Sequence, residues 1–167
     1  IYNYSIYTDG LKVYTTIDSR MQKYAEEAAY QHVVKFLQPA FTAENKRKPN
    51  APYSNNLTQQ QVDQILNRSI RQCERYRVLR ENHASEAEIQ RSFRTPTCMS
   101  VFTYHGEIDT TMTPLDSIKY YKTFLRTGFV SVCPQNGHVK AYVGGLDYGH
   151  FAYDMVMDGR RQVGSRS

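Results

Sequence analysis

Asp147, His150 and Asp154 are residues of types that could together bind a metal ion. Their spacings of three and four residues would place them on one face of a helix, where such residues are neighbours. Gly149 stands among them and disfavours a helix. We therefore expect a surface loop here, and the sequence predicts neither a metal site nor a cofactor.

Acid–base chemistry has two further candidates, each with a simpler structural interpretation. Glu26 and Glu27 are adjacent, so on a helix their carboxylates diverge and cannot act as a pair. Both are expected to be solvated. His32 follows the apolar stripe of the same predicted helix, which favours a histidine packed in the core.

The cysteines and serines give no complete nucleophilic site by spacing alone. Cys73, Cys98 and Cys133 are far apart and form no C-x-x-C pair, which argues against structural zinc. One disulfide plus a free thiol stays open, but we favour three buried thiols. The terminal Gly-Ser-Arg-Ser run lacks the G-x-S-x-G spacing of an α/β-hydrolase nucleophile elbow.

Composition is that of an ordinary globular protein, with 40% hydrophobic and 22% charged residues. The net charge of +5 suits an anionic partner such as a cell-wall polymer. The basic run from Lys46 to Lys48 is too short to indicate nucleic acid, and a solvated loop is expected there. No apolar run reaches the roughly 20 residues of a membrane span, so any membrane anchor is expected outside this sequence.

Three β-hairpins are predicted from alternation and turn residues. Residues 1–17 alternate around Asp9-Gly10, which predicts two short strands. Residues 99–111 read as a hairpin that turns at His105-Gly106. Residues 129–145 read as another, in which Asn136-Gly137 favours the left-handed backbone of a tight turn.

The remaining segments predict helices separated by a proline- and asparagine-rich loop over residues 40–56. Ser19 with Gln22, and Ser85 with Glu88, have capping-box spacing. Apolar positions recur at three and four residues after each start. The predicted helices run from Ser19 to Pro39, from Thr58 to about Asn82, from Ser85 to Phe93 and from Thr113 to Gly128.

This order of elements predicts an α+β fold with antiparallel terminal hairpins packed against amphipathic helices. Residues 1–39 and 114–167 are expected to form one unit. Residues 40–113 are expected to be an inserted helical and hairpin module.

Three blocks resemble the class A (bifunctional) penicillin-binding proteins, of the 1A-like type. Residues 10–18, Gly-Leu-Lys-Val-Tyr-Thr-Thr-Ile-Asp, are similar to the family's segment that leaves the glycosyltransferase domain. Residues 129–145, ending in Val-Gly-Gly, are similar to the first strands of the transpeptidase sheet. Residues 161–165, Arg-Gln-Val-Gly-Ser, are similar to the family's segment before the nucleophile.

The resemblance implies that Ser165 is the acyl nucleophile that opens an S-x-x-K motif. It assigns residues 1–39 to the interdomain linker and first helix, and residues 114–167 to the start of the transpeptidase domain. The whole protein would polymerise lipid II, cross-link peptidoglycan stem peptides and react with β-lactams. It would lie on the periplasmic side of the bacterial inner membrane, anchored by an N-terminal helix that this sequence does not contain.

No motif lysine, S-x-N or K-T-G follows Ser165 in this sequence, which ends two residues later. We therefore expect this piece to be an inactive, structural fragment that positions the catalytic domains or docks a regulator of wall synthesis. Arg166-Ser167 is hypothesised to be a cloning remnant. A sheet cut after two strands would have an exposed edge, which predicts self-association.

Two other functions stay open. A basic, tyrosine-rich module without enzyme activity could bind a polysaccharide or another polyanion, since aromatic platforms with cations support such binding. The chain has 14 tyrosines and no tryptophan. A complete β-lactamase-like enzyme is excluded unless residues continue beyond Ser167.

Overall fold

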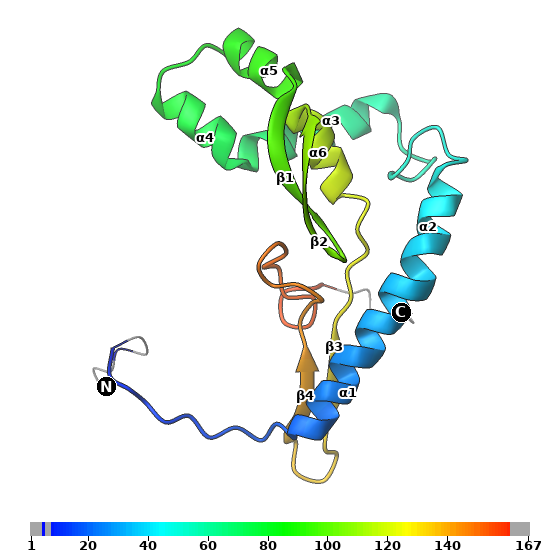
Figure 1. Ribbon diagram of the computed structural model, residues 1–167, viewed down its shortest axis with the longest axis vertical. Coiled ribbons are helices and arrows are strands. Elements are labelled where there is room, and N and C mark those ends of the chain that lie inside the picture. Colours follow the sequence, from blue (N-terminus) through cyan, green and yellow to red (C-terminus); the bar gives the residue numbers. More distant parts are fainter. Residues whose placement is uncertain (1–4, 6–7, 161–167) are drawn as a thin grey trace. The chain divides into compact units, whose positions relative to one another are not determined.

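The computed structural model describes residue 5 and residues 8–160 (Figure 1). The chain divides into two compact units. Ile1–Ala29 with Thr127–Ser167 form the first, here called the hairpin unit, and Tyr30–Arg126 form the second, here called the central unit. Both contain helix and antiparallel sheet, so the predicted α+β class is confirmed.

In the hairpin unit, β3 (Phe129–Val132) pairs antiparallel with β4 (Val139–Val143). Ser131 lies opposite Ala141, and the register shifts after Ser131. Gly137 has a φ of +71° in the connecting turn, which is the left-handed conformation that Asn-Gly favours. The predicted hairpin over residues 129–145 is therefore confirmed.

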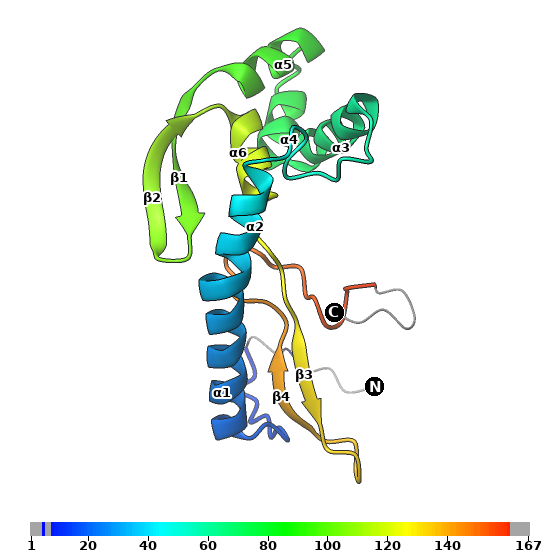
Figure 2. The ribbon, with the colours of Figure 1, turned by 90° about the vertical axis from the view of Figure 1, so that its right-hand side faces the viewer.

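Helix α1 (Ser19–Tyr30) packs on one face of this hairpin (Figure 2). Ala25 is buried against Ala141 and Val143, with Ala29 partly buried beside them. Small side chains at this contact let the helix backbone come close to the sheet. The hairpin of β3 and β4 is therefore packed against a helix, as the predicted α+β fold requires.

The start of α1 differs from the prediction. Asp18, not Ser19, provides the cap: its Oδ1 accepts hydrogen bonds from the N–H groups of Arg20 and Met21 at 2.9 and 3.2 Å. Gln22 does not complete a capping box, because its side-chain amide bonds to the backbone of Tyr142 in β4. The predicted box was wrong because spacing cannot reveal a tertiary partner.

The predicted N-terminal hairpin is also wrong where it can be compared. Described residues 8–17 contain no strand, and the remainder of that prediction lies outside the described residues. Val13 and Tyr14 are 75% and 91% exposed, so their alternation buries nothing. Near the end of the described part of this segment, Thr16 and Asp18 bond to the carbonyls of Val139 and Lys140.

In the central unit, a π-helix, η1 (Gln31–Leu37), precedes α2 (Gln38–Asn45). Pro39 was expected to end a helix, but it occupies the first turn of α2, where a missing N–H costs little. His32 is exposed and not in the core. The wider π-helical turn changes which residues share a face, so of η1 only Val33 is buried.

Four α-helices and one hairpin complete the central unit. The capping boxes at Thr58 and Ser85 are both formed, which confirms the predicted helix start at Ser85. The hairpin predicted over residues 99–111 is confirmed. These elements are α3 (Gln59–Gln72), α4 (Glu74–Glu81), α5 (Glu86–Arg94), β1 (Thr97–Thr103), β2 (Gly106–Met112) and α6 (Pro114–Tyr121).

Two helix lengths were predicted wrongly. The helix expected over residues 58–82 is broken at Cys73, whose ψ of 144° is extended. Periodicity missed the break because Ile70 and Tyr76, on either side, pack into one core. The last helix ends at Tyr121, not at Gly128, since backbone groups beyond it bond to the Gln38 side chain instead.

The core of the central unit is built around Ile70, Ile89 and Phe93, which are at most 4% exposed. The three cysteines are free thiols, and they are not all buried: Cys73 and Cys133 are half-buried and Cys98 is exposed. Cys98 lies on the outward face of β1, where alternation puts every second side chain in solvent. No helix in the described part is long and apolar enough to cross a membrane.

Candidate functional site

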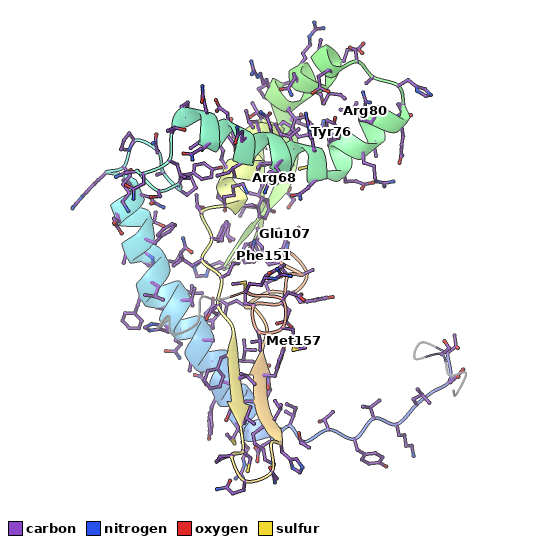
Figure 3. All side chains as sticks on the ribbon, turned by 180° about the vertical axis from the view of Figure 1, so that it is seen from behind. Arg68, Tyr76, Arg80, Glu107, Phe151 and Met157 are labelled. Carbon is purple, nitrogen blue, oxygen red and sulfur yellow. The ribbon has the colours of Figure 1, made fainter. Side chains whose placement is uncertain are left out.

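Ser165 lies outside the described residues, but the loop that precedes it along the chain is described as far as Arg160. This loop, residues 144–160, follows β4 and carries Phe151 and Met157, which Figure 3 labels. Hydrogen bonds made by this loop fix the path of the chain after β4.

One carboxylate organises this loop. The Tyr142 hydroxyl in β4 donates a hydrogen bond of 2.5 Å to Oδ2 of Asp154. Oδ1 of Asp154 accepts from the N–H groups of Val156 and Met157 at 2.8 and 2.9 Å. Met155 N–H also donates to the Gly144 carbonyl at 2.8 Å, so Asp154 is bonded to β4 and Met155 to the residue that directly follows β4.

The bond between Tyr142 and Asp154 shifts the pKa values of these two residues in opposite directions. The hydrogen bond from Tyr142, followed by those from the backbone N–H groups, lowers the pKa of Asp154 below its ordinary value. Accepting that bond while charged, Asp154 raises the pKa of Tyr142 to about 12. At neutral pH the pair is therefore a carboxylate held by a neutral phenol.

Two glycines are required by this packing. A Cβ atom at Gly144 would lie 2.7 Å from Oδ2 of Asp154, and one at Gly159 would lie 2.4 Å from the Met155 carbonyl oxygen. Neither distance is sterically possible without movement. The Gly-Gly that ends the predicted hairpin thus makes room for the carboxylate.

The three residues first considered as metal ligands do not converge. Asp147 bonds to Nδ1 and to the N–H of His150, at 3.0 and 2.8 Å, and these bonds lower the pKa of Asp147. Asp154 is engaged by Tyr142 instead. Across residue 5 and residues 8–160, no group of three His, Cys, Asp or Glu side chains could hold a metal ion.

The remaining acid–base candidates lie apart from this loop's bonds. Glu26 and Glu27 are both exposed, as predicted, and Glu26 accepts a 2.7 Å bond from Gln22. Sequence patterns missed the roles of Gln22 and Tyr142. A signal was present in the paired glycines after β4, which indicate a close approach to the strand end.

The central unit has a groove of about 450 Å³ between α2 and the β1–β2 turn. Gln38 holds its walls together: Nε2 donates to the Thr123 carbonyl at 2.9 Å, and Oε1 accepts from Leu125 N–H and the Tyr104 hydroxyl. Phe124 packs edge-on against Tyr104 with ring centroids 5.4 Å apart. The basic side chains that line the groove are those of Lys46 and His105.

Residues 48–125 match a family model described as the penicillin-binding protein middle domain. The chain contains a domain related to penicillin-binding proteins. This stretch is somewhat less than half of the chain and lies entirely within the central unit. No curated protein and no solved structure matches the chain.

The similarity to the penicillin-binding protein middle domain is independent of the three blocks noted in the sequence. Residues 10–18, 129–145 and 161–165 all fall outside the matched stretch. The matched stretch therefore indicates a relation to penicillin-binding proteins from residues that those blocks do not include.

Proposed function

We propose that this chain is part of a class A penicillin-binding protein, a bifunctional peptidoglycan synthase of the bacterial cell wall. The observation that carries this proposal is the match of residues 48–125 to the penicillin-binding protein middle domain, flanked on both sides by blocks that resemble class A members. The protein would act on the periplasmic side of the inner membrane, on lipid II and on peptidoglycan stem peptides.

Ser165 is the proposed acyl nucleophile. Its Oγ would attack the carbonyl carbon of the D-alanyl-D-alanine amide; the C–N bond breaks, and the departing D-alanine takes up the proton. A serine hydroxyl is a weak nucleophile unless a base activates it. In S-x-x-K that base is a lysine one helical turn later, which corresponds to position 168 and lies outside this sequence.

The described residues would help to position Ser165 and would take no part in the reaction. The Tyr142–Asp154 bond and the Met155–Gly144 bond anchor the loop that precedes residues 161–165. A loop held at both points limits the conformations open to the chain after it. The described loop would in this way help to set the distance of Ser165 from the sheet.

Labelling of the full-length natural protein with a fluorescent penicillin tests this proposal. A β-lactam acylates the same serine that attacks the stem peptide, so the protein should be labelled and Ser165→Ala should remove the label. Ser19→Ala, at an exposed serine at the start of α1, is the control and should be labelled normally. Equal labelling of Ser165→Ala and the unmodified protein would refute the assignment.

Charge favours a second candidate, a binding module for an anionic partner. The central unit has 14 Lys and Arg against 9 Asp and Glu, so it carries the whole net charge of +5, while the hairpin unit is neutral. The groove beside Lys46 and His105 would fit an acidic segment of a regulator of wall synthesis.

Salt dependence separates the two candidates. A polyanion-binding module should bind heparin, used as a probe, with an affinity that falls steeply between 50 and 200 mM salt. Lys46→Glu should weaken binding if the groove takes part, while Lys12→Glu, on the exposed N-terminal segment, should not. Absence of heparin binding at low salt would eliminate this second function and leave the synthase proposal untouched.

A further inference from the structure

A small cavity opens in the loop after β4. Its volume is about 180 Å³, and aromatic rings dominate its lining: Tyr142, Tyr148, Phe151 and Tyr153, with the Asp154 carboxylate and small residues completing the wall. At about 30 Å³ for each water molecule, this space would hold roughly six waters. It is large enough for a side-chain-sized group.

The segment that forms the cavity is acidic, although the chain as a whole is basic and Lys140 and Arg160 flank this segment. Residues 142–159 contain three aspartates and neither lysine, arginine nor glutamate. Asp154 lines the cavity and is ionised at neutral pH because its hydrogen bonds lower its pKa. The charge of Asp158 also acts on Tyr142, which shows that a second carboxylate lies near.

The Asp154 carboxylate keeps acceptor capacity. Its Oδ2 accepts the Tyr142 hydroxyl, and each carboxylate oxygen offers about two lone-pair positions. A donor that enters the cavity could therefore bond to Asp154 without displacing Tyr142. A cation would serve best, because a charged donor makes a stronger bond to a carboxylate than a neutral donor does.

The rings add a second attraction for a cation. The faces of tyrosine and phenylalanine rings attract an ammonium group within about 6 Å. Tyr153 is held by a hydrogen bond from its hydroxyl to the Asp158 carbonyl. Tyr148 is 81% exposed at the rim, where its ring could close over a ligand.

From this combination we propose that the cavity binds an alkylammonium group, either the side chain of a lysine-type residue or a free amine. The ammonium would bond to Oδ2 of Asp154 while its methylene groups contact the rings. The site lies wholly within the hairpin unit. It does not depend on the proposed function of Ser165 or on the central unit.

Titration of the 167-residue chain with four probes, followed by the amide resonances of residues 144–154, tests the proposal. The probes are Nα-acetyl-lysine methylamide, its Nε-trimethyl derivative, n-butylammonium and the neutral isostere Nα-acetyl-norleucine methylamide. At least one ammonium probe should bind at least tenfold more tightly than norleucine. Binding by butylammonium as tight as by the lysine probe would identify a free amine as sufficient, whereas tighter binding by the lysine probe would identify an amino-acid-borne amine.

Two tyrosine variants complete the test. Tyr148→Ala should weaken ammonium binding at least threefold, since it removes an exposed ring at the rim. Tyr14→Ala, which removes a 91% exposed tyrosine outside the cavity, should leave the affinity unchanged. Norleucine binding equal to that of every ammonium probe, or unchanged affinity in Tyr148→Ala, would overturn the proposal.

Discussion

The side-chain amide of Gln22 in α1 bonds to both backbone polar groups of Tyr142 in β4. Nε2 donates to the Tyr142 carbonyl and Oε1 accepts from the Tyr142 N–H, each at 2.8 Å. The amide thereby takes the place that a neighbouring strand would have at this position. Asp18 N–H bonds to the Lys140 carbonyl at 2.9 Å on the same strand, so the start of α1 covers one edge of the hairpin.

Removal of this amide should destabilise the hairpin unit. Gln22→Ala leaves two half-buried backbone groups without their partner, and we expect a loss of about 1–2 kcal/mol. Hydrogen exchange at Ala141 and Val143 measures the loss locally. Lys23→Ala, at the next and exposed position of α1, should change the exchange rates little. Equal effects of the two variants would contradict the role given to Gln22.

The opposite edge of the hairpin is the one available for association. Because the backbone groups of Tyr142 point toward Gln22, its partner Val130 is in a non-hydrogen-bonded pair, and the Val130 N–H and C=O point away from β4. Phe129, Val130 and Val132 are 42–49% exposed. An unprotected strand edge of this kind favours pairing with another chain.

We therefore predict that the 167-residue chain self-associates through β3. Val130→Lys should shift the mass measured by light scattering toward the monomer, since an edge lysine opposes strand pairing. Val13→Lys places the same charge on an exposed valine outside the sheet and should not shift it. A monomeric unmodified chain at high concentration would contradict the prediction.

The Tyr142–Asp154 bond predicts a pH window. Asp154 has a lowered pKa, so its contribution is present above the ordinary value of 3.8 and is lost as pH falls through the lower folded value. Tyr142 has a pKa raised to about 12, so its contribution is present below the ordinary 10.0 and is lost as pH rises from there toward 12.

Tyr142→Phe should consequently be less stable than the unmodified chain between about pH 5 and 9, and the difference should shrink at both extremes. This stability difference is measured by urea denaturation at several pH values, with unfolding followed through the amide resonance of Ala141. Tyr148→Phe changes an exposed tyrosine in the same loop and should give no such profile. A difference that stays constant from pH 5 to 12 would contradict the assigned bond.

The core of the central unit predicts a large loss from one truncation. Phe93 is 1% exposed and packs with Ile70 and Ile89, so Phe93→Ala should cost about 3–5 kcal/mol of unfolding free energy. Urea denaturation followed through resonances of α5 gives the value. Val78→Ala, at a position 41% exposed on α4, should cost far less. A small effect of Phe93→Ala would show that this cluster is not the core.

The sequence correctly predicted those elements whose ends are set by residues close together in the chain, such as a capping box or a turn glycine. Ser85 with Glu88, and Asn136 with Gly137, act through bonds and backbone preferences that neighbouring residues alone determine. The prediction errors arose where a hydrogen-bond partner far away in the sequence determines the local structure. The Gln22 side chain bonds to the backbone of Tyr142 and does not form the expected capping box. The Gln38 side chain bonds to the backbone after α6, where the helix was expected to continue.

The candidate site divides in the same way. Ser165 is proposed as the nucleophile from the resemblance of a short block, because a nucleophile motif is continuous in sequence, and this stays a prediction. The Tyr142–Asp154 pair could not be named, since the two residues are brought together only when the loop folds back on β4. The sequence indicated Asp154 only as a possible metal ligand, whereas in the structure its carboxylate accepts a hydrogen bond from Tyr142.

The most direct test of the proposed function is to locate the acyl group after the full-length natural protein has reacted with a β-lactam. Peptide mass mapping should find the adduct on the peptide that contains Ser165, at the Oγ of that residue and at no other serine. An adduct on a different serine, or a folded protein that acquires no adduct, would contradict the identification of this chain with a wall-synthesising transpeptidase.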